Sequence, residues 1–157
     1  KVMSDEEKIA LVDRLSKYGR VYISSEGPVP DELKDKLLKT PYHLIHHVLA
    51  FAQLVFSEGA TIASEAAVLG VHALYVNTIQ SGSTREQSER YGLLYCFHDP
   101  DERFRQAADK AVELLETPHL VEMGQAKRRK LLEEKVDING YFMQEMERLV
   151  KVGRKGK

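Results

Sequence analysis

The residues with the clearest spacing for chemistry are Gly59, Thr61 and Glu65, which follow the apolar run at 53–57. We expect that run to be a strand and residues 61–69 to be a helix of small residues. The start of such a helix offers free backbone N–H groups and a positive dipole end, which bind phosphate or diphosphate. There Gly59 would admit a ligand close to the backbone, Thr61 can cap the helix, and Glu65 can accept hydrogen bonds from ribose hydroxyls.

The residues also fit a plainer interpretation. Gly59 can be an ordinary turn residue, and Glu65 can simply complement the helix dipole. The spacing matches neither GxGxxG nor GxxxxGK, the two established phosphate-binding patterns. Spacing alone therefore leaves both interpretations open.

A second group of candidates is expected at the same edge of the sheet. Ser25, Glu26 and Gly27 end a predicted strand at 20–25, where they would contact a base or sugar, or merely cap the next helix. Arg85 lies in a polar stretch and could bind a phosphate as a bidentate donor, or be a solvated loop charge.

Histidine and cysteine usage predicts no metal site and no nucleophile. His43, His46 and His47 are close in sequence, but nothing supplies further ligands, so we expect His46 and His47 at a helix surface with one ring partly buried. The single cysteine, Cys96, has no adjacent base and cannot form an internal disulfide. A lone thiol in an apolar run suits a reducing cytoplasm. No catalytic residue is assigned and no cofactor is required.

The elements that must position these residues alternate between helix and strand. Ser4 and Glu7 have the spacing of a capping box at the start of the first helix. The patterns predict helices at 5–18, 31–38, 41–52, 61–69, 101–116, 118–135 and 138–152, strands at 20–25, 53–57, 72–77 and 92–97, and a polar loop at 78–92. Near-continuous apolar strands separated by helices predict an α/β fold with a parallel sheet covered on both faces. We expect a domain at 1–135 and a C-terminal helix with a basic tail at 136–157.

Composition limits the classes of function. The chain has 157 residues, 43% hydrophobic, with a net charge of −1, which suits one domain or half of a larger protein. From Gln125 onward Lys and Arg outnumber Asp and Glu by ten to five, but interleaved aromatics are lacking, so no nucleic-acid partner is expected. The longest apolar stretch, 48–56, falls short of the roughly 20 residues of a membrane span. The chain begins at Lys1 rather than Met, which suggests a fragment.

The run from Gly59 to Ala73 resembles the C-terminal nucleotide-sugar-binding domain of GT-B enzymes, such as the GlcNAc transferase of peptidoglycan synthesis and UDP-GlcNAc 2-epimerase. It is more similar still to the related family called domain of unknown function 354. The resemblance covers most of residues 5–150, and the segments that carry it are 17–27, 46–52, 59–70 and 90–93. One departure is His72, where these proteins usually have proline.

The resemblance implies a Rossmann-like C-terminal half of a GT-B fold, lacking its first strand. In such a half Gly59, Ala60 and Thr61 bind the diphosphate and Glu65 binds the ribose of a nucleotide-sugar. The N-terminal half, which usually brings the acceptor and the catalytic base, is absent from this chain. We therefore expect the donor-binding part of a glycosyltransferase-like or epimerase-like enzyme, inactive alone. The alternative is a non-catalytic α/β module for assembly or binding.

The last predicted helix suggests a homodimer. Its apolar side chains recur at helical spacing and form a stripe with no N-terminal half to cover it. These residues are Ile138, Tyr141, Phe142, Met146, Leu149 and Val150.

Overall fold

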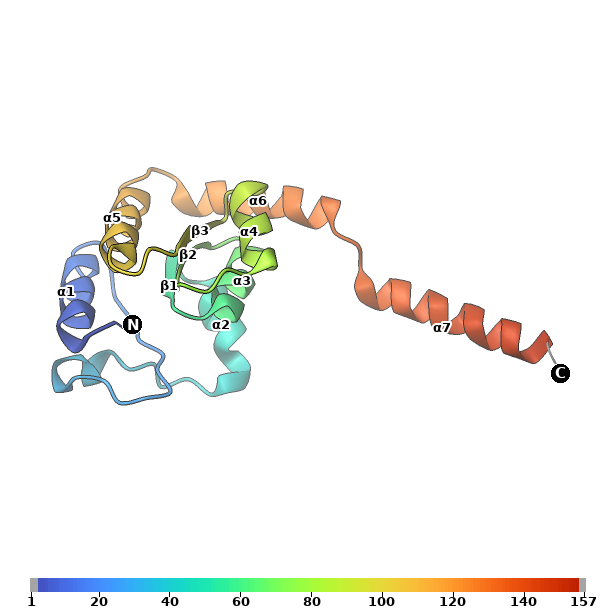
Figure 1. Ribbon diagram of the computed structural model, residues 1–157, viewed down its shortest axis with the longest axis horizontal. Coiled ribbons are helices and arrows are strands. Elements are labelled where there is room, and N and C mark those ends of the chain that lie inside the picture. Colours follow the sequence, from blue (N-terminus) through green and yellow to red (C-terminus); the bar gives the residue numbers. More distant parts are fainter. Residues whose placement is uncertain (1–2, 156–157) are drawn as a thin grey trace.

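The computed structural model describes residues 3–155, and side chains as far as residue 151 (Figure 1). The last two residues of the predicted basic tail lie outside the described residues. The α-helices are α1 (Asp5–Leu15), α2 (Ile45–Ala50), α3 (Ala60–Val68), α4 (Gly82–Glu89), α5 (Arg103–Leu115), α6 (Leu120–Glu134) and α7 (Ile138–Lys155). Two 3₁₀ helices span Asp31–Lys36 and Tyr42–Leu44, and the strands are β1 (Leu54–Ser57), β2 (His72–Val76) and β3 (Leu94–Phe97).

The three strands form one parallel sheet in the order β1-β2-β3. Leu54 lies opposite His72, and Ala73 lies opposite Leu94. The central strand β2 is buried along its whole length. Helix α3 connects β1 to β2 and α4 connects β2 to β3, so each crossover is helical, as parallel neighbours require. The predicted α/β class is confirmed.

Side chains of β2 alternate between two cores, one on each face of the sheet. Ala73 and Tyr75 belong to a cluster with Ala63 and Ala66 of α3. Leu74 and Val76 belong to the opposite cluster, which includes residues of α5. Helices therefore cover both faces, with α2, α3 and α4 on one and α1 and α5 on the other (Figure 1). This three-layer arrangement is Rossmann-like.

Helix α1 begins with the predicted capping box, which is confirmed: Ser4 Oγ accepts from the Glu7 N–H, and the Ser4 N–H donates to Glu7 Oε2.

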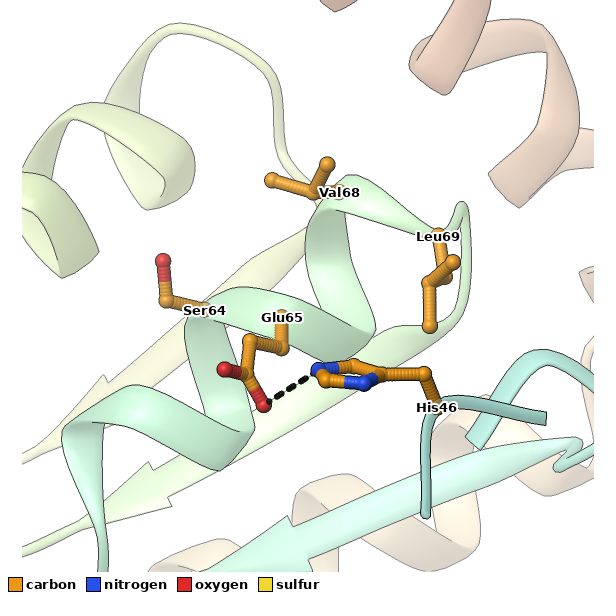
Figure 2. A pocket seen from close by; sticks show the side chains of 5 residues that line it. All are labelled: His46, Ser64, Glu65, Val68 and Leu69. Carbon is orange, nitrogen blue, oxygen red and sulfur yellow. Dashed lines mark ion pairs between the residues drawn. The ribbon is translucent and has the colours of Figure 1, made fainter. Parts of the chain in front are cut away.

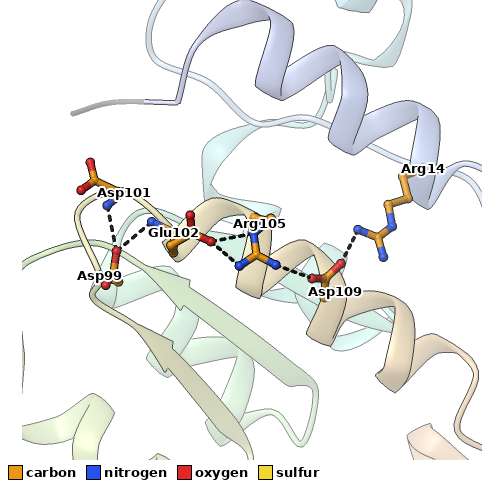
Figure 3. Close-up of polar contacts among 6 residues, drawn as sticks. All are labelled: Arg14, Asp99, Asp101, Glu102, Arg105 and Asp109. Carbon is orange, nitrogen blue, oxygen red and sulfur yellow. Dashed lines mark hydrogen bonds and ion pairs between the residues drawn. The ribbon is translucent and has the colours of Figure 1, made fainter.

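Near its other end, α1 is joined to α5 by an ion pair. Arg14 Nη1 lies 2.7 Å from Asp109 Oδ1, and Arg105 of α5 contacts the same carboxylate (Figure 3). These pairs are partly exposed, so each contributes at most about 1 kcal/mol.

The predicted strand at 20–25 is not a strand of the sheet. Only Ile23 makes a bridge, and its partner is Leu37. The Ile23 N–H donates to the Lys36 carbonyl, and the Ile23 carbonyl accepts from the Leu38 N–H. The backbone of this segment is thus paired with the chain after the first 3₁₀ helix, which leaves three sheet strands in the described part of the chain instead of four.

The predicted loop at 78–92 contains helix α4. Its buried face is made by two polar residues one turn apart, Thr84 and Gln87. Thr84 Oγ1 donates to the Ser81 carbonyl at 2.9 Å, and Gln87 Nε2 to the Ser64 carbonyl at 3.4 Å. Because the buried face of α4 is polar, its sequence lacks the helical spacing of apolar residues. The sequence pattern therefore predicted a loop.

Helix α6 crosses the amino-terminal side of the sheet, and α7 leaves the body of the molecule. Gly124 of α6 packs directly on the backbone of Gly70, which precedes β2. Helix α7 then extends away from the sheet and the other helices (Figure 1). Among the helices of residues 3–155, none is long and apolar enough to cross a membrane.

Candidate functional site

The amino end of α3 lies at the carboxyl edge of the sheet, directly after β1. Gly59 is its N-cap residue, and no described side chain caps this end of the helix. Ser57 turns the chain here: its Oγ accepts from the Gly59 N–H and donates to the Gly59 carbonyl, both at 3.0 Å. The predicted capping role of Thr61 is wrong, because the helix begins at Ala60 and Thr61 lies inside its first turn.

Gly59 does not occupy a left-handed turn. Its backbone is extended, with φ −98° and ψ 124°. A Cβ atom built there would lie 3.6 Å from Ser57 Oγ, an ordinary van der Waals contact. Neither backbone conformation nor packing requires glycine at this position, so the fold itself does not account for it.

The ends of β2 and β3 are tied to the same edge by two polar residues. Asn77 follows β2, and its Nδ2 donates to the Glu58 carbonyl at 2.9 Å. His98 follows β3, and its Nδ1 lies 2.5 Å from the Asn77 carbonyl oxygen, a contact in which Nδ1 must be the donor. Sequence reasoning missed Asn77 as a site residue, although it is the first polar residue after a buried strand.

Asp99 follows His98 and lies in the turn that leads to α5, the helix that packs on the face of the sheet opposite α3. Its carboxylate accepts from the N–H groups of Asp101 and Glu102 (Figure 3). These two hydrogen bonds lower the pKa of Asp99. The Asp99 carboxylate thus holds the turn before α5 (Arg103–Leu115), whose N-cap residue is Glu102 and has no side-chain cap.

Glu65 lies on the second turn of α3 and faces α2. Its Oε2 is 3.2 Å from His46 Nε2, and the two side chains point toward each other (Figure 2). They line an open pocket of about 260 Å³ together with Ser64, Val68 and Leu69. Ser64 points away from the pair, so serine, histidine and glutamate do not form a catalytic relay here.

Ser25 and Gly27 line a second pocket, of about 550 Å³, together with Glu58. Ser25 Oγ donates to the Gly27 carbonyl at 3.0 Å, which makes a tight turn. Glu58 immediately precedes Gly59, so this pocket borders the amino end of α3. The two pockets share no lining residue, and Glu26 lines neither.

Arg85 is placed apart from the other candidates. It lies on α4, lines neither pocket, and its Nε donates to Glu89 Oε1 at 2.9 Å. Its side chain is 73% exposed. The structure thus brings Ser25 and Gly27 to the neighbourhood of Gly59 but leaves Arg85 on the surface of a neighbouring helix.

The described residues contain neither a cluster of metal ligands nor an activated cysteine. No group of three or more His, Cys, Asp or Glu side chains there could hold a metal ion. His46 pairs with Glu65 rather than with His43 or His47. Burial raises the pKa of the Cys96 thiol, which keeps it protonated and a poor nucleophile.

Fold and site together define a Rossmann-like α/β unit with an uncapped helix amino terminus at the carboxyl edge of its sheet, bordered by the pocket that Glu58 lines. The chain matches no protein-family model and, at a significant level, no curated protein.

Proposed function

We propose that this chain binds a nucleotide-sugar of the UDP-sugar type, with the diphosphate at the amino end of α3. The observation that carries the proposal is Gly59: it begins an uncapped helix at the carboxyl edge of a parallel sheet, and the fold does not need a glycine there. Close approach of a ligand to the backbone accounts for it. Ligands of open α/β sheets bind at this edge, and helix amino ends bind phosphate.

The two pockets support an extended ligand. Glu58 lines one pocket and directly precedes the N-cap residue Gly59, whereas Glu65 lines the other. Glu65 lies six positions after Gly59, which is about 9 Å along the helix axis. A nucleoside diphosphate reaches from the helix start to a ribose-binding carboxylate on the second turn, and leaves the attached sugar near Ser25 and Gly27.

In this proposal the chain is the donor-binding part of a GT-B-like glycosyltransferase or epimerase. The helix amino end would stabilise the charge of the diphosphate while the anomeric bond of the sugar breaks. Among the described residues no side chain stands out as a catalytic base, so binding without turnover is the expected behaviour of this chain. The cytoplasmic location suggested by the lone Cys96 stays a prediction.

A thermal-shift panel tests the proposal directly. We expect UDP and a UDP-sugar to raise the unfolding midpoint, because a ligand that binds only the folded state stabilises it by mass action. Uridine and inorganic phosphate, each lacking half of the ligand, are expected to shift it less. A midpoint that no nucleoside diphosphate moves contradicts the proposal.

Gly59→Val sharpens this test. The extended backbone accepts valine, so the free energy of unfolding should change little, whereas the branched side chain would block a phosphate. Gly19→Val is the matched control, because a Cβ at Gly19 meets nothing within 4 Å and so, like one at Gly59, clashes with no neighbour. Loss of the UDP shift in the Gly59 variant alone supports the site, and an equal shift in both variants excludes close approach at Gly59.

A further inference from the structure

Helix α7 carries a broad apolar face that no other described part of the chain covers. Seven large side chains on it have half or more of their surface exposed, and Phe142 and Met143 reach 63%. They are Ile138, Tyr141, Phe142, Met143, Met146, Leu149 and Val150. At 3.6 residues per turn they occupy about half of the helix circumference.

A helix in this position needs a partner. Isolated helices of about 15 residues are marginal in water, and most helices in proteins are stabilised by burial of an amphipathic face. Helix α7 has 18 residues, includes Gly140, and stands away from the sheet and the other helices (Figure 1). Its helical state is therefore best explained by a surface that covers the apolar side.

Charge along α7 favours one kind of partner. The half from Ile138 to Glu147 contains Glu145 and Glu147 and no basic residue, whereas the half from Arg148 onward contains Lys151, Arg154 and Lys155 and no acidic one. Two copies side by side in parallel would place like charges together. In an antiparallel pair each acidic half lies beside the basic half of the other copy.

The area of the face fits such a pair. Seven side chains that each offer on the order of 100 Å² approach the roughly 800 Å² per partner of a standard protein–protein interface. From the uncovered face and the charge pattern, we propose that α7 pairs antiparallel with α7 of a second copy of this chain. The pairing is independent of nucleotide binding, because α7 contributes no residue to either pocket.

Sedimentation velocity over about a hundredfold range of concentration tests the pairing, since dimer populations follow mass action. We expect a monomer–dimer equilibrium for the unmodified chain and a dissociation constant raised about tenfold or more by Phe142→Glu. Gln144→Glu is the matched control: it adds the same charge on the opposite face and should leave the dimer intact. Circular dichroism and the thermal midpoint check that both variants fold.

Cysteine cross-linking in a Cys96→Ser background tests the orientation. In an antiparallel pair Met146→Cys lies near the midpoint and meets its own copy, whereas the two Asn139→Cys sites lie about 20 Å apart. Disulfide formation needs Cα atoms within about 7 Å. We expect cross-linking at 146 and none at 139.

Four results overturn the proposal: a chain that is monomeric at every concentration, Phe142→Glu without effect, equal disruption by Gln144→Glu, or cross-linking at 139. A basic amphipathic helix can also lie on a membrane surface. Binding of the monomeric chain to vesicles of anionic phospholipid, without self-association, would assign the face to lipid instead.

Discussion

The Glu65 carboxylate lies 3.2 Å from the His46 imidazole, and both side chains line an open pocket of about 260 Å³. If Glu65 holds the ribose of a nucleotide, Glu65→Ala removes a charge-assisted hydrogen bond worth about 1–3 kcal/mol. Calorimetric titration with UDP should show that loss of affinity. The fold should survive, because the side chain is partly exposed and leaves an already open pocket.

Glu89→Ala is the control for Glu65→Ala. Glu89 is also a helix glutamate in an ion pair, here with Arg85, but it lines neither pocket. UDP affinity should be unchanged in this variant. Equal affinity in the Glu65 variant and the unmodified chain removes Glu65 from the proposed site.

His72 governs a pH dependence of stability. It is 1% exposed in β2, and burial lowers its pKa to about 4 from an ordinary value of 6.5, with Lys127 and Lys110 adding to the effect. Between pH 6.5 and about pH 4, His72 is protonated in the unfolded chain and neutral in the folded chain. The free energy of unfolding therefore falls as pH falls through this window, by roughly 2–3 kcal/mol at about pH 4.5.

His72→Leu should remove that part of the pH dependence, because leucine fills the site without titrating. Urea unfolding at about pH 7 and about pH 4.5 measures it. His47→Leu changes an exposed histidine and should keep the full dependence. A His72 variant that loses as much stability in acid as the unmodified chain would show that other groups control it.

At the residue scale, sequence located part of the candidate site. Gly59 and Glu65 were identifiable because their strand-turn-helix context is continuous in sequence. Asn77 and His98 follow later strands, and only the folded sheet brings Asn77 to Glu58 and His98 to Asn77. The His46–Glu65 pair could not be predicted from the sequence either, because residue spacing does not indicate which face of α2 packs against α3.

A glycine lets α6 pack closely on the residues just before β2. A Cβ at Gly124 would lie 2.2 Å from the Gly70 carbonyl oxygen and 3.4 Å from the His72 ring. Alanine is normally the better helix former by about 1 kcal/mol. Here the clash with backbone should outweigh that gain, and Gly124→Ala should destabilise the fold by a net amount of about 1–3 kcal/mol.

Gly82→Ala provides the comparison, because Gly82 is also helical but a Cβ there meets nothing within 4 Å. It should be neutral or slightly stabilising. Denaturant unfolding of the two variants measures this difference, and we expect the lower midpoint for Gly124→Ala. A stabilised Gly124 variant would mean that α6 can lift away from Gly70 at little cost.

At the element scale, apolar periodicity decided what the sequence could predict. Strands β1, β2 and β3 and helices α5, α6 and α7 were predicted within a few residues, because each carries an apolar run or stripe. Helix α4 was missed because Thr84 and Gln87 form its buried face. The segment around Ile23 has the composition of a strand, but its backbone pairs with residues 36–38 and not with the sheet. Composition indicates an extended segment and does not indicate which segment it pairs with.

For the whole molecule, the division near residue 135 predicts how the chain tolerates truncation. Helix α6 ends at Glu134 with its cap residue Lys135 bonded to Glu86 of α4, whereas α7 begins at Ile138 and projects from the body (Figure 1). Among the side chains that the structure describes, those in the cores on both faces of the sheet end at Leu131. A chain ending at residue 135 should therefore keep its thermal midpoint within about 2–4 °C, the shift that about 1 kcal/mol produces at this size.

The concentration at which the midpoint is measured separates folding from assembly. In dilute solution the truncated and full chains should unfold at the same temperature, because no described side chain of α7 belongs to either core. In concentrated solution the full chain should unfold at a higher temperature if copies pair through α7, since association stabilises the folded state by mass action. A truncated chain that is already less stable when dilute would show instead that α7 packs on its own body, against the arrangement in Figure 1.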